Sequence, residues 1–254
     1  MNIIIPLKQV PDTQSTLKIA TDGKSIDSTG LSWVLNPYDE FSIEAALRIK
    51  STQPNVVVTL VSIGPDRVQQ ALRTGLAMGA DAAVHIKMDD LLGAMTVAKV
   101  LAAFLKTRSY DLIICGKQAV DDDASTVGPA LAGLLDIPQL CVLRKLDCAD
   151  GMLTVEKETD TGSELWKCPL PALVTIQLGL NEPRFPSLPG IMKSKKIPIE
   201  VVPIETLGVG LKSGFTIEKL ELPPERKAGR MLTGTPTEQV QQLWDALKNE
   251  AKVL

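Results

Sequence analysis

Short apolar runs alternate with longer stretches of helical spacing through the first half of the chain. The runs read NIIIPL (2–7), VVVTLVSIG (56–64), AAVHI (82–86) and DLIICG (111–116). Short, continuously apolar strands separated by helices are typical of a parallel sheet that is covered on both faces. The alternation therefore predicts an α/β fold with a doubly wound, mainly parallel sheet.

The stretches between these runs carry helix start and stop signals. We expect four helices, at about 37–50, 65–79, 94–108 and 125–136. Asn36 is expected to cap the first of them, with Asp39 in the first turn, where the helix dipole favours a negative charge. Gly79 is expected to end the second.

Beyond about residue 140 the pattern changes to an alternation of period two. Such alternation is typical of antiparallel strands, and Asp150-Gly151 is a strong hairpin signal. We expect residues 140–180, approximately, to add antiparallel strands to an edge of the sheet.

The last part of the chain lacks the pattern of a globular core. Residues 203–238 are rich in proline, glycine and charge and poor in apolar periodicity. They precede an amphipathic helix whose apolar stripe consists of Val240, Leu243, Trp244 and Leu247. The sequence thus predicts one α/β domain over 1–202 and an extended arm over 203–254. The terminal helix either folds back onto that domain or docks on another chain.

Composition excludes several classes of function. With 30 acidic and 27 basic residues and a net charge of −3, the chain offers no large basic face for nucleic acid. The apolar run at the start is too short for a signal peptide, and no segment approaches the roughly 20 apolar residues of a membrane span. We expect a soluble protein of a reducing compartment, the cytoplasm, that is not embedded in a membrane.

Metal and disulfide chemistry are equally unexpected. The four cysteines, at positions 115, 141, 148 and 168, form no C-x-x-C pair. The single histidine, His85, lies inside an apolar run and is expected to pack in the core. No nucleophile has an evident neighbouring base, so we predict no catalytic residue and no metal site.

The ends of the predicted strands carry the most informative polar residues. In a doubly wound sheet, ligands bind outside the carboxyl ends of the strands, where loops meet helix N-termini. The loop GKQAVDDDASTVGP (116–129) lies at such an end. Its backbone amides and the hydroxyls of Ser125 and Thr126 are placed to bind a phosphate, and Gly116 and Gly128 permit close backbone approach.

Three carboxylates in this loop, those of Asp121, Asp122 and Asp123, would repel a phosphate and need another explanation. Stabilisation of the helix dipole is expected to account for at least one of them. Another can bind a ribose hydroxyl or a backbone amide. A magnesium site is weakly supported, because neither a P-loop nor a G-x-G-x-x-G motif occurs in the chain.

A second unusual stretch, NEPRFPSLPGIMKSKK (181–196), combines an exposed leucine with a basic cluster. Leu188 lies in a proline-rich loop, and a short helix bearing Lys193, Lys195 and Lys196 is expected to follow. On an arbitrary protein this would be an ordinary surface loop and a solvated helix end.

Together these stretches resemble the β subunit of electron transfer flavoprotein over essentially the full length of the chain. The similarity rests on LKQVPD, NPYDEFSIEAALR, TGLAMGAD, GKQAVDDD, VEKETDTGSELWKCPLPALVTI and NEPRFPSLPGIMKSKK. The resemblance implies a Rossmann-like, adenine-nucleotide-binding fold and a heterodimer with a larger α subunit, which holds most of the contacts to FAD. It further implies that electrons pass from an acyl-CoA dehydrogenase of fatty acid oxidation to a membrane quinone oxidoreductase or another acceptor.

The same resemblance assigns residues. A structural AMP would be held at the strand ends by Pro6, Asn36, Pro37, Tyr38, Asp39, Ile63, Gly116, Gln118, Ala119, Val120, Asp121, Asp122, Asp123, Ala124, Ser125, Thr126, Val127 and Gly128. Residues 181–196 would form the recognition loop, whose Leu188 anchors in an apolar pocket of the dehydrogenase beside Pro189, Ile191, Met192, Lys193 and Lys196. The lysines would steer an acidic partner more than add affinity, and the arm would reach across the α subunit.

The resemblance leaves the nucleotide open. Some members bind a second FAD in place of AMP, oxidise NADH and split its electrons between two acceptors. Those members show Asp-Gly-Asp and then Thr-Ala-Gln-Val-Gly-Pro, whereas this chain reads DDDASTVGP at 121–129. Asp122 favours AMP, and the Val-Gly-Pro ending matches the bifurcating pattern.

Two alternatives lie outside electron transfer. A stand-alone adenine-nucleotide sensor would not need the recognition loop or the arm. An adenine-nucleotide hydrolase would need a phosphate-binding motif and a catalytic base, which the sequence does not show.

Overall fold

A computed structural model describes residues 1–89, 92–210, 214–224 and 228–254. In this part of the chain one sheet of nine strands runs in the order β11-β5-β4-β1-β6-β10-β7-β8-β9, and β2 and β3 form a separate pair. The strands are β1 (Asn2–Pro6), β2 (Gln9–Pro11), β3 (Trp33–Leu35), β4 (Val57–Gly64), β5 (Ala82–Lys87), β6 (Leu112–Gly116), β7 (Gln139–Ala149), β8 (Met152–Thr159), β9 (Gly162–Pro169), β10 (Ala172–Ile176) and β11 (Ile199–Pro203).

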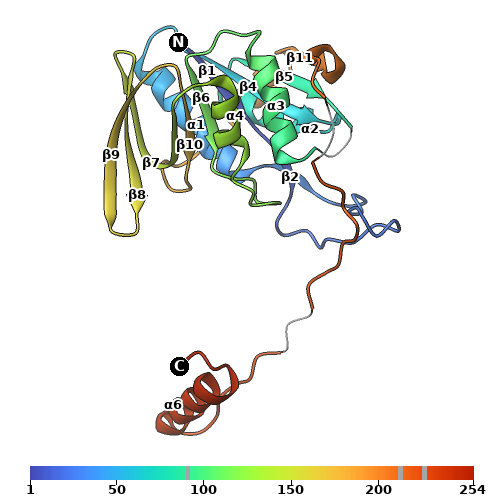
Figure 1. Cartoon of the computed structure of the whole chain (residues 1–254), viewed down its shortest axis with the longest axis vertical. Helices are drawn as coiled ribbons and strands as arrows, with labels where there is room; N and C mark the ends of the chain where they lie inside the picture. The colour runs from blue at the N-terminus through green and yellow to red at the C-terminus, as the bar shows by residue number, and fades with distance from the viewer. Residues whose placement is uncertain (90–91, 211–213, 225–227) are drawn as a thin grey trace.

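Helices cover both faces of this sheet (Figure 1). They are α1 (Pro37–Thr52), α2 (Val68–Met78), α3 (Ala94–Leu105), α4 (Val127–Leu135), α5 (Leu188–Ser194) and α6 (Pro236–Asp245), with short helical segments η1 (Ile204–Leu207) and η2 (Ala246–Glu250). Ile43 and Leu72, from α1 and α2, belong to one apolar core, and Leu101 and Leu131, from α3 and α4, belong to a second. The prediction of a doubly wound, mainly parallel sheet is confirmed.

The boundaries of the helices differ from the predicted ones by a few residues. Helix α2 begins at Val68, after a turn that contains Pro65, and α3 ends at Leu105. Gly79 does end α2, with a φ of 131°. The predicted hairpin is also present, because Asp150 and Gly151 have positive φ values of 50° and 75° and join β7 to β8.

The prediction that residues 140–180 are purely antiparallel is wrong in one respect. Strand β10 pairs in parallel with β6 and with the first residues of β7, and only β7, β8 and β9 pair antiparallel at the edge. All five residues of β10, ALVTI, are buried. A strand buried on both faces is continuously apolar and is typical of a parallel interior position.

The opposite edge strand, β11, has no counterpart among the predicted strands. It pairs in parallel with β5, although its sequence IEVVP contains a charge and a proline. Both residue types are common on edge strands, where one row of backbone groups remains unpaired.

The strand order places a topological switch point beside β1. From β1 the chain proceeds outward through β4 to β5, and α3 then returns it to β6 on the other side of β1. The loops after β1 and β6 therefore lie beside each other at the carboxyl ends of these two strands, the edge at which ligands of doubly wound sheets bind. The polar residues identified in the sequence lie in these loops and at the start of α1.

The C-terminal helix lies apart from the sheet (Figure 1). No residue of α6 is buried, and Val240, Leu243 and Trp244 are 67%, 48% and 50% exposed. The fold-back arrangement is therefore not adopted, and the apolar stripe has no covering surface within the described residues. Parts of the predicted arm, 211–213 and 225–227, lie outside the described residues.

Candidate nucleotide site at the carboxyl edge of the sheet

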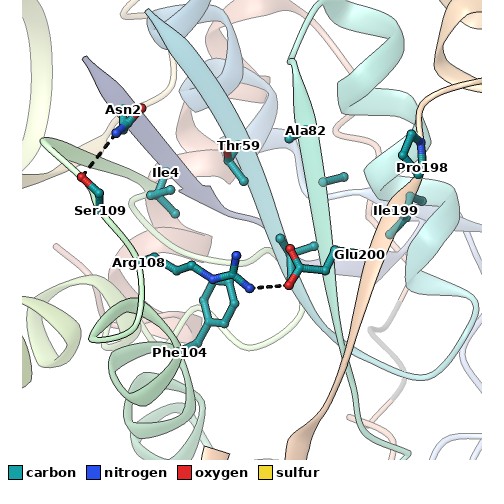
Figure 2. A pocket seen from close by; sticks show the side chains of 12 residues that line it. Asn2, Ile4, Thr59, Ala82, Phe104, Arg108, Ser109, Pro198, Ile199 and Glu200 are labelled. Atoms are coloured by element: carbon teal, nitrogen blue, oxygen red, sulfur yellow. Dashed lines mark hydrogen bonds and ion pairs between the residues drawn. The ribbon is translucent and has the colours of Figure 1, made fainter.

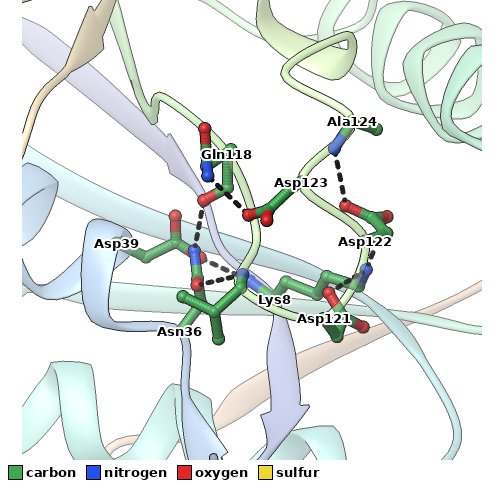
Figure 3. A network of polar contacts seen from close by, with 9 residues as sticks. Lys8, Asn36, Asp39, Gln118, Asp121, Asp122, Asp123 and Ala124 are labelled. Carbon is green, nitrogen blue, oxygen red and sulfur yellow. Dashed lines mark hydrogen bonds and ion pairs between the residues drawn. The ribbon is translucent and has the colours of Figure 1, made fainter. Parts of the chain in front are cut away.

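The structure brings the predicted strand-end residues to one edge. Pro6 ends β1, Ile63 lies next to the end of β4, Gly116 ends β6, and residues 36–39 begin α1. The loop 117–126 leads from β6 into α4. Figure 3 shows how the polar side chains of these segments meet.

Asn36 connects the start of α1 to the loop after β6. Its side chain is 1% exposed, its Nδ2 donates to the Gln118 carbonyl at 3.0 Å, and its Oδ1 accepts from the Val120 amide at 3.2 Å. Asn36 occupies the predicted N-cap position, but its side chain makes no capping hydrogen bond to a backbone amide of the helix. The amide side chain instead holds the loop in place.

Asp39 lies directly beneath this loop. Its carboxylate is buried and accepts the Lys8 amide at 2.8 Å. A Cβ on Gly116 would fall 2.4 Å from the Asp39 Oδ1, so the glycine is required for α1 to pack on β6. Gly116 thus has a packing role, and its role in the close approach of a ligand stays a prediction.

Burial raises the pKa of Asp39 to about 7. The loss of hydration is the largest cause, and the hydrogen bonds from Lys8, Asn36 and Gly116 offset it only in part. The predicted stabilisation of a charge by the helix dipole is thus outweighed by desolvation at this position.

We expect this carboxyl group to make stability fall as pH rises. Unfolded Asp39 loses its proton near its ordinary value of 3.8, whereas the folded protein retains it up to about 7. Between these values the folded state binds more protons than the unfolded state, so the free energy of unfolding declines as pH rises. The total decline is on the order of 4 kcal/mol, and the profile levels off above about pH 7.

Asp39→Asn should flatten this part of the profile when the melting temperature of the complex is followed from pH 4.5 to 8. The exposed Asp147→Asn variant should retain the slope, and a wild-type slope in Asp39→Asn would contradict the assignment.

The three loop aspartates are held by side chains. Lys8 Nζ contacts Asp121 Oδ1 at 2.7 Å and Asp122 Oδ2 at 3.0 Å, and Gln118 donates its Nε2 to Asp123. No acidic residue lies in the first turn of α4, so the helix-dipole explanation of these charges is wrong. Lys8 was not among the predicted site residues, although its place two residues after Pro6 puts it at a strand end.

The backbone between Asp123 and Gly128 has an unusual conformation. Asp123 and Ser125 have φ values of 49° and 48°, and Thr126 is right-handed. A left-handed residue beside a right-handed one turns successive N–H groups toward one side and makes an anion-binding nest. The N–H groups of Val127 and Gly128 add to it, because the first amides of a helix have no partner within the helix.

The hydroxyls that were expected at a phosphate are engaged within the loop. Ser125 Oγ donates to Gln118 Oε1 at 3.2 Å, and Thr126 Oγ1 donates to the Ala124 carbonyl at 2.7 Å. A Cβ on Gly128 would lie 2.8 Å from Thr175 Cγ2, so this glycine allows α4 to pack on β10. The backbone amides are therefore the donors that this loop offers to an anion.

Three further predicted residues near the strand ends pack into the body of the protein. Tyr38 is buried, Ile63 packs against the core of the α3 and α4 face, and Pro6 is buried at the end of β1. His85 is fully buried, with its Nε2 2.7 Å from the Gly64 carbonyl oxygen, so the prediction of a core histidine is confirmed. Among the described residues, no group of three or more His, Cys, Asp or Glu could hold a metal ion.

A groove of about 400 Å³ lies at the opposite, amino-terminal edge of the sheet. Figure 2 shows Asn2, Thr59 and Phe104 along it, with an ion pair between Arg108 and Glu200 across it. None of the predicted nucleotide residues lines this groove.

The predicted partner-binding residues lie on α5, except Lys196, which follows it, and α5 packs against α2. Leu188 is 75% exposed, Met192 is 56% exposed, and Phe185, which was not predicted, is 94% exposed. Helix α5 ends at Ser194, so it carries Lys193 only, and Lys195 and Lys196 follow it. Leu188 and Met192 thus form an exposed apolar patch on a short helix, and Phe185 precedes that helix.

None of the described helices has the length and apolar character that crossing a membrane would require.

A sequence profile of the electron transfer flavoprotein domain matches residues 24–207, which contain most of the sheet and the loop after β6. Known relatives are similar over the whole chain. The electron transfer flavoprotein subunit beta of Bacillus subtilis is 40% identical over 100% of both chains, and the mitochondrial subunit beta of Arabidopsis thaliana is 38% identical over 100% of both. The human subunit beta is 38% identical over 90% of this chain and 91% of its own length.

These similarities define the class as electron transfer flavoproteins. The chain belongs to the β-subunit family of electron transfer flavoproteins. A β subunit implies an α subunit as its partner, and membership of a flavoprotein family implies association with a flavin.

Proposed function

We propose that this chain is the β subunit of a heterodimer that carries electrons from an acyl-CoA dehydrogenase of fatty acid oxidation to a membrane quinone oxidoreductase or another acceptor. The FAD, when bound, supplies the redox chemistry and is held mostly by the α subunit. This chain contributes a structural AMP site, a docking surface for the dehydrogenase and the arm that joins the subunits. Its four cysteines are free thiols, which is consistent with the cytoplasm.

The loop after β6 is the observation that carries the nucleotide assignment. It combines a nest of backbone amides and a helix N-terminus at the switch point of the sheet. The single positive charge of Lys8 lies between Asp121 and Asp122 and offsets part of the repulsion that a phosphate would otherwise meet. The loop residues therefore fit a phosphate bound through the backbone.

Asp122 favours AMP over a second FAD. Its carboxylate contacts Lys8 and also accepts the Ala124 amide at 3.1 Å, so it helps to hold the loop in its present shape. The glycine that bifurcating members have at this position could make neither contact. The Val-Gly-Pro ending at 127–129 keeps the bifurcating protein, with a second FAD and NADH as donor, as the alternative.

The nucleotide released from the purified heterodimer tests this assignment. Mass analysis should find one AMP and one FAD, whereas two FAD and no AMP would favour bifurcation. Gly128→Val should lower AMP affinity about tenfold, because a larger side chain meets Thr175 and displaces the start of α4. Ser125→Ala should stay within about twofold, since it removes only the hydrogen bond to Gln118. Equal effects of the two substitutions would argue against a site built from backbone groups.

A further inference from the structure

The exposed apolar patch on α5 belongs to a segment that is tied to the body of the protein at both ends. We propose that Arg184 and Arg73 are positioning residues that hold the segment 184–197 on helices α1 and α2 and thereby set how readily an electron donor docks on it. The docking half of this inference rests on the function proposed above, and the positioning half does not.

Arg184 fixes the first end of the segment. Its Nε and Nη2 contact the two carboxylate oxygens of Glu44 at 2.7 and 3.0 Å, a two-pronged ion pair with α1. The Glu44 side chain is only 5% exposed, so the pair is shielded from solvent on that side. Just before it, Asn181 Nδ2 donates to the Phe41 carbonyl at 3.0 Å, so α1 is contacted twice.

Arg73 fixes the second end. From α2, its Nη1 donates to the carbonyls of Ser194, the last residue of α5, and of Ile197, which follows the helix. Carbonyl groups at the end of a helix have no partner within it, and a cationic donor satisfies them well. Arg73 therefore acts as a C-terminal cap supplied by another helix.

Between these two points the backbone is packed tightly. A Cβ on Gly190 would lie 2.3 Å from the Ala77 carbonyl oxygen, so α5 rests directly on the end of α2. Ser187 caps α5 by accepting the Gly190 amide at 3.1 Å. Phe185 and Leu188 are nevertheless exposed on this fixed backbone. A segment held in its docking conformation loses little conformational freedom on binding, which raises affinity and association rate.

Removal of either contact should loosen the segment in the free protein. We expect Arg73→Met in the heterodimer to increase amide hydrogen exchange within 184–197 at least about tenfold while exchange in the sheet stays unchanged. For Arg184, the double variant Glu44→Gln with Arg184→Met should also increase exchange, and it avoids an unpaired buried carboxylate. Arg184→Lys should keep part of the protection of these amides against exchange. The matched control is Arg48→Met, because Arg48 also contacts Glu44, at 3.2 Å, but belongs to α1 itself.

Electron uptake from a purified acyl-CoA dehydrogenase tests the second half. The KM for the heterodimer should rise about tenfold in Arg73→Met, while kcat, flavin content and melting temperature stay close to the wild-type values. Unchanged exchange in 184–197 would overturn the positioning role. If Arg73→Met exchanges faster but takes up electrons normally, while Leu188→Ala impairs uptake, the link between positioning and docking would be overturned. Faster exchange with normal uptake in all variants, Leu188→Ala included, would support positioning and overturn the docking function assigned to α5.

Discussion

A heterodimer that lacks residues 230–254 is expected to dissociate into its subunits under conditions in which the full-length complex stays intact. The deleted segment contains α6, no residue of which is buried in this chain. Val240, Leu243 and Trp244 are the residues of the apolar stripe that lie in α6, whereas Leu247 lies in η2. Burial of three such side chains on a partner contributes roughly 5 kcal/mol before the ordering of the arm is counted. We therefore expect the Kd for assembly to rise at least about a hundredfold.

Co-purification with a tagged α subunit and sedimentation of the complex measure this change. A triple variant that replaces Val240, Leu243 and Trp244 with serine should reproduce the deletion, since the apolar stripe carries the proposed contact. Gln241→Ala, on the same helix, should assemble normally, because Gln241 contacts only Asp245 of its own helix in the hydrogen bonds described. Wild-type assembly of the deletion variant would show that the arm is not the connection between the subunits.

The second large effect is expected at Leu188. Leu188→Ala should slow reduction of the flavin by the acyl-CoA dehydrogenase at subsaturating concentrations, with loss of about 2 kcal/mol in docking free energy, roughly thirtyfold in affinity. The side chain is 75% exposed, so its truncation creates no cavity in the core. Melting temperature, flavin spectrum and nucleotide content should therefore remain at wild-type values.

The neighbouring lysines provide the comparison that separates anchoring from steering. A double variant, Lys193→Gln with Lys196→Gln, should lower the association rate at low salt and matter little at high salt, because exposed charges are screened beyond about 10 Å at 0.1 M ionic strength. The defect of Leu188→Ala should persist at both salt concentrations. A Leu188→Ala protein that accepts electrons at the wild-type rate would return the segment to an ordinary surface loop.

Local patterns were sufficient for the elements in which neighbouring residues decide the structure. The apolar runs became parallel strands, Gly79 ended α2, and Asp150-Gly151 formed the hairpin turn. In each case the signal depends on residues that are close to one another in the sequence and therefore also in space. The place of the candidate site was predicted from the same signals, since ligands of doubly wound sheets bind at the carboxyl ends of the strands.

The contacts inside the site depended on residues that are distant in the sequence. Asn36 has the signature of a helix cap, yet its side chain binds the loop more than eighty positions further along. Lys8 meets Asp121 and Asp122 only because β1 and β6 are neighbours in the sheet. A sequence pattern identifies polar groups that need hydrogen-bond partners. It does not show which of several possible partners each group takes in the fold.

Hydrophobic periodicity and turn residues act over short distances, so they were sufficient to predict the fold class, most of the elements and the edge of the sheet at which the candidate site lies. They could not show that β10 is an interior parallel strand, that the pKa of Asp39 rises through burial, or that α6 lies apart from the sheet. Each of these properties depends on what surrounds a residue in space: a second strand, excluded water, or the absence of a covering surface among the described residues.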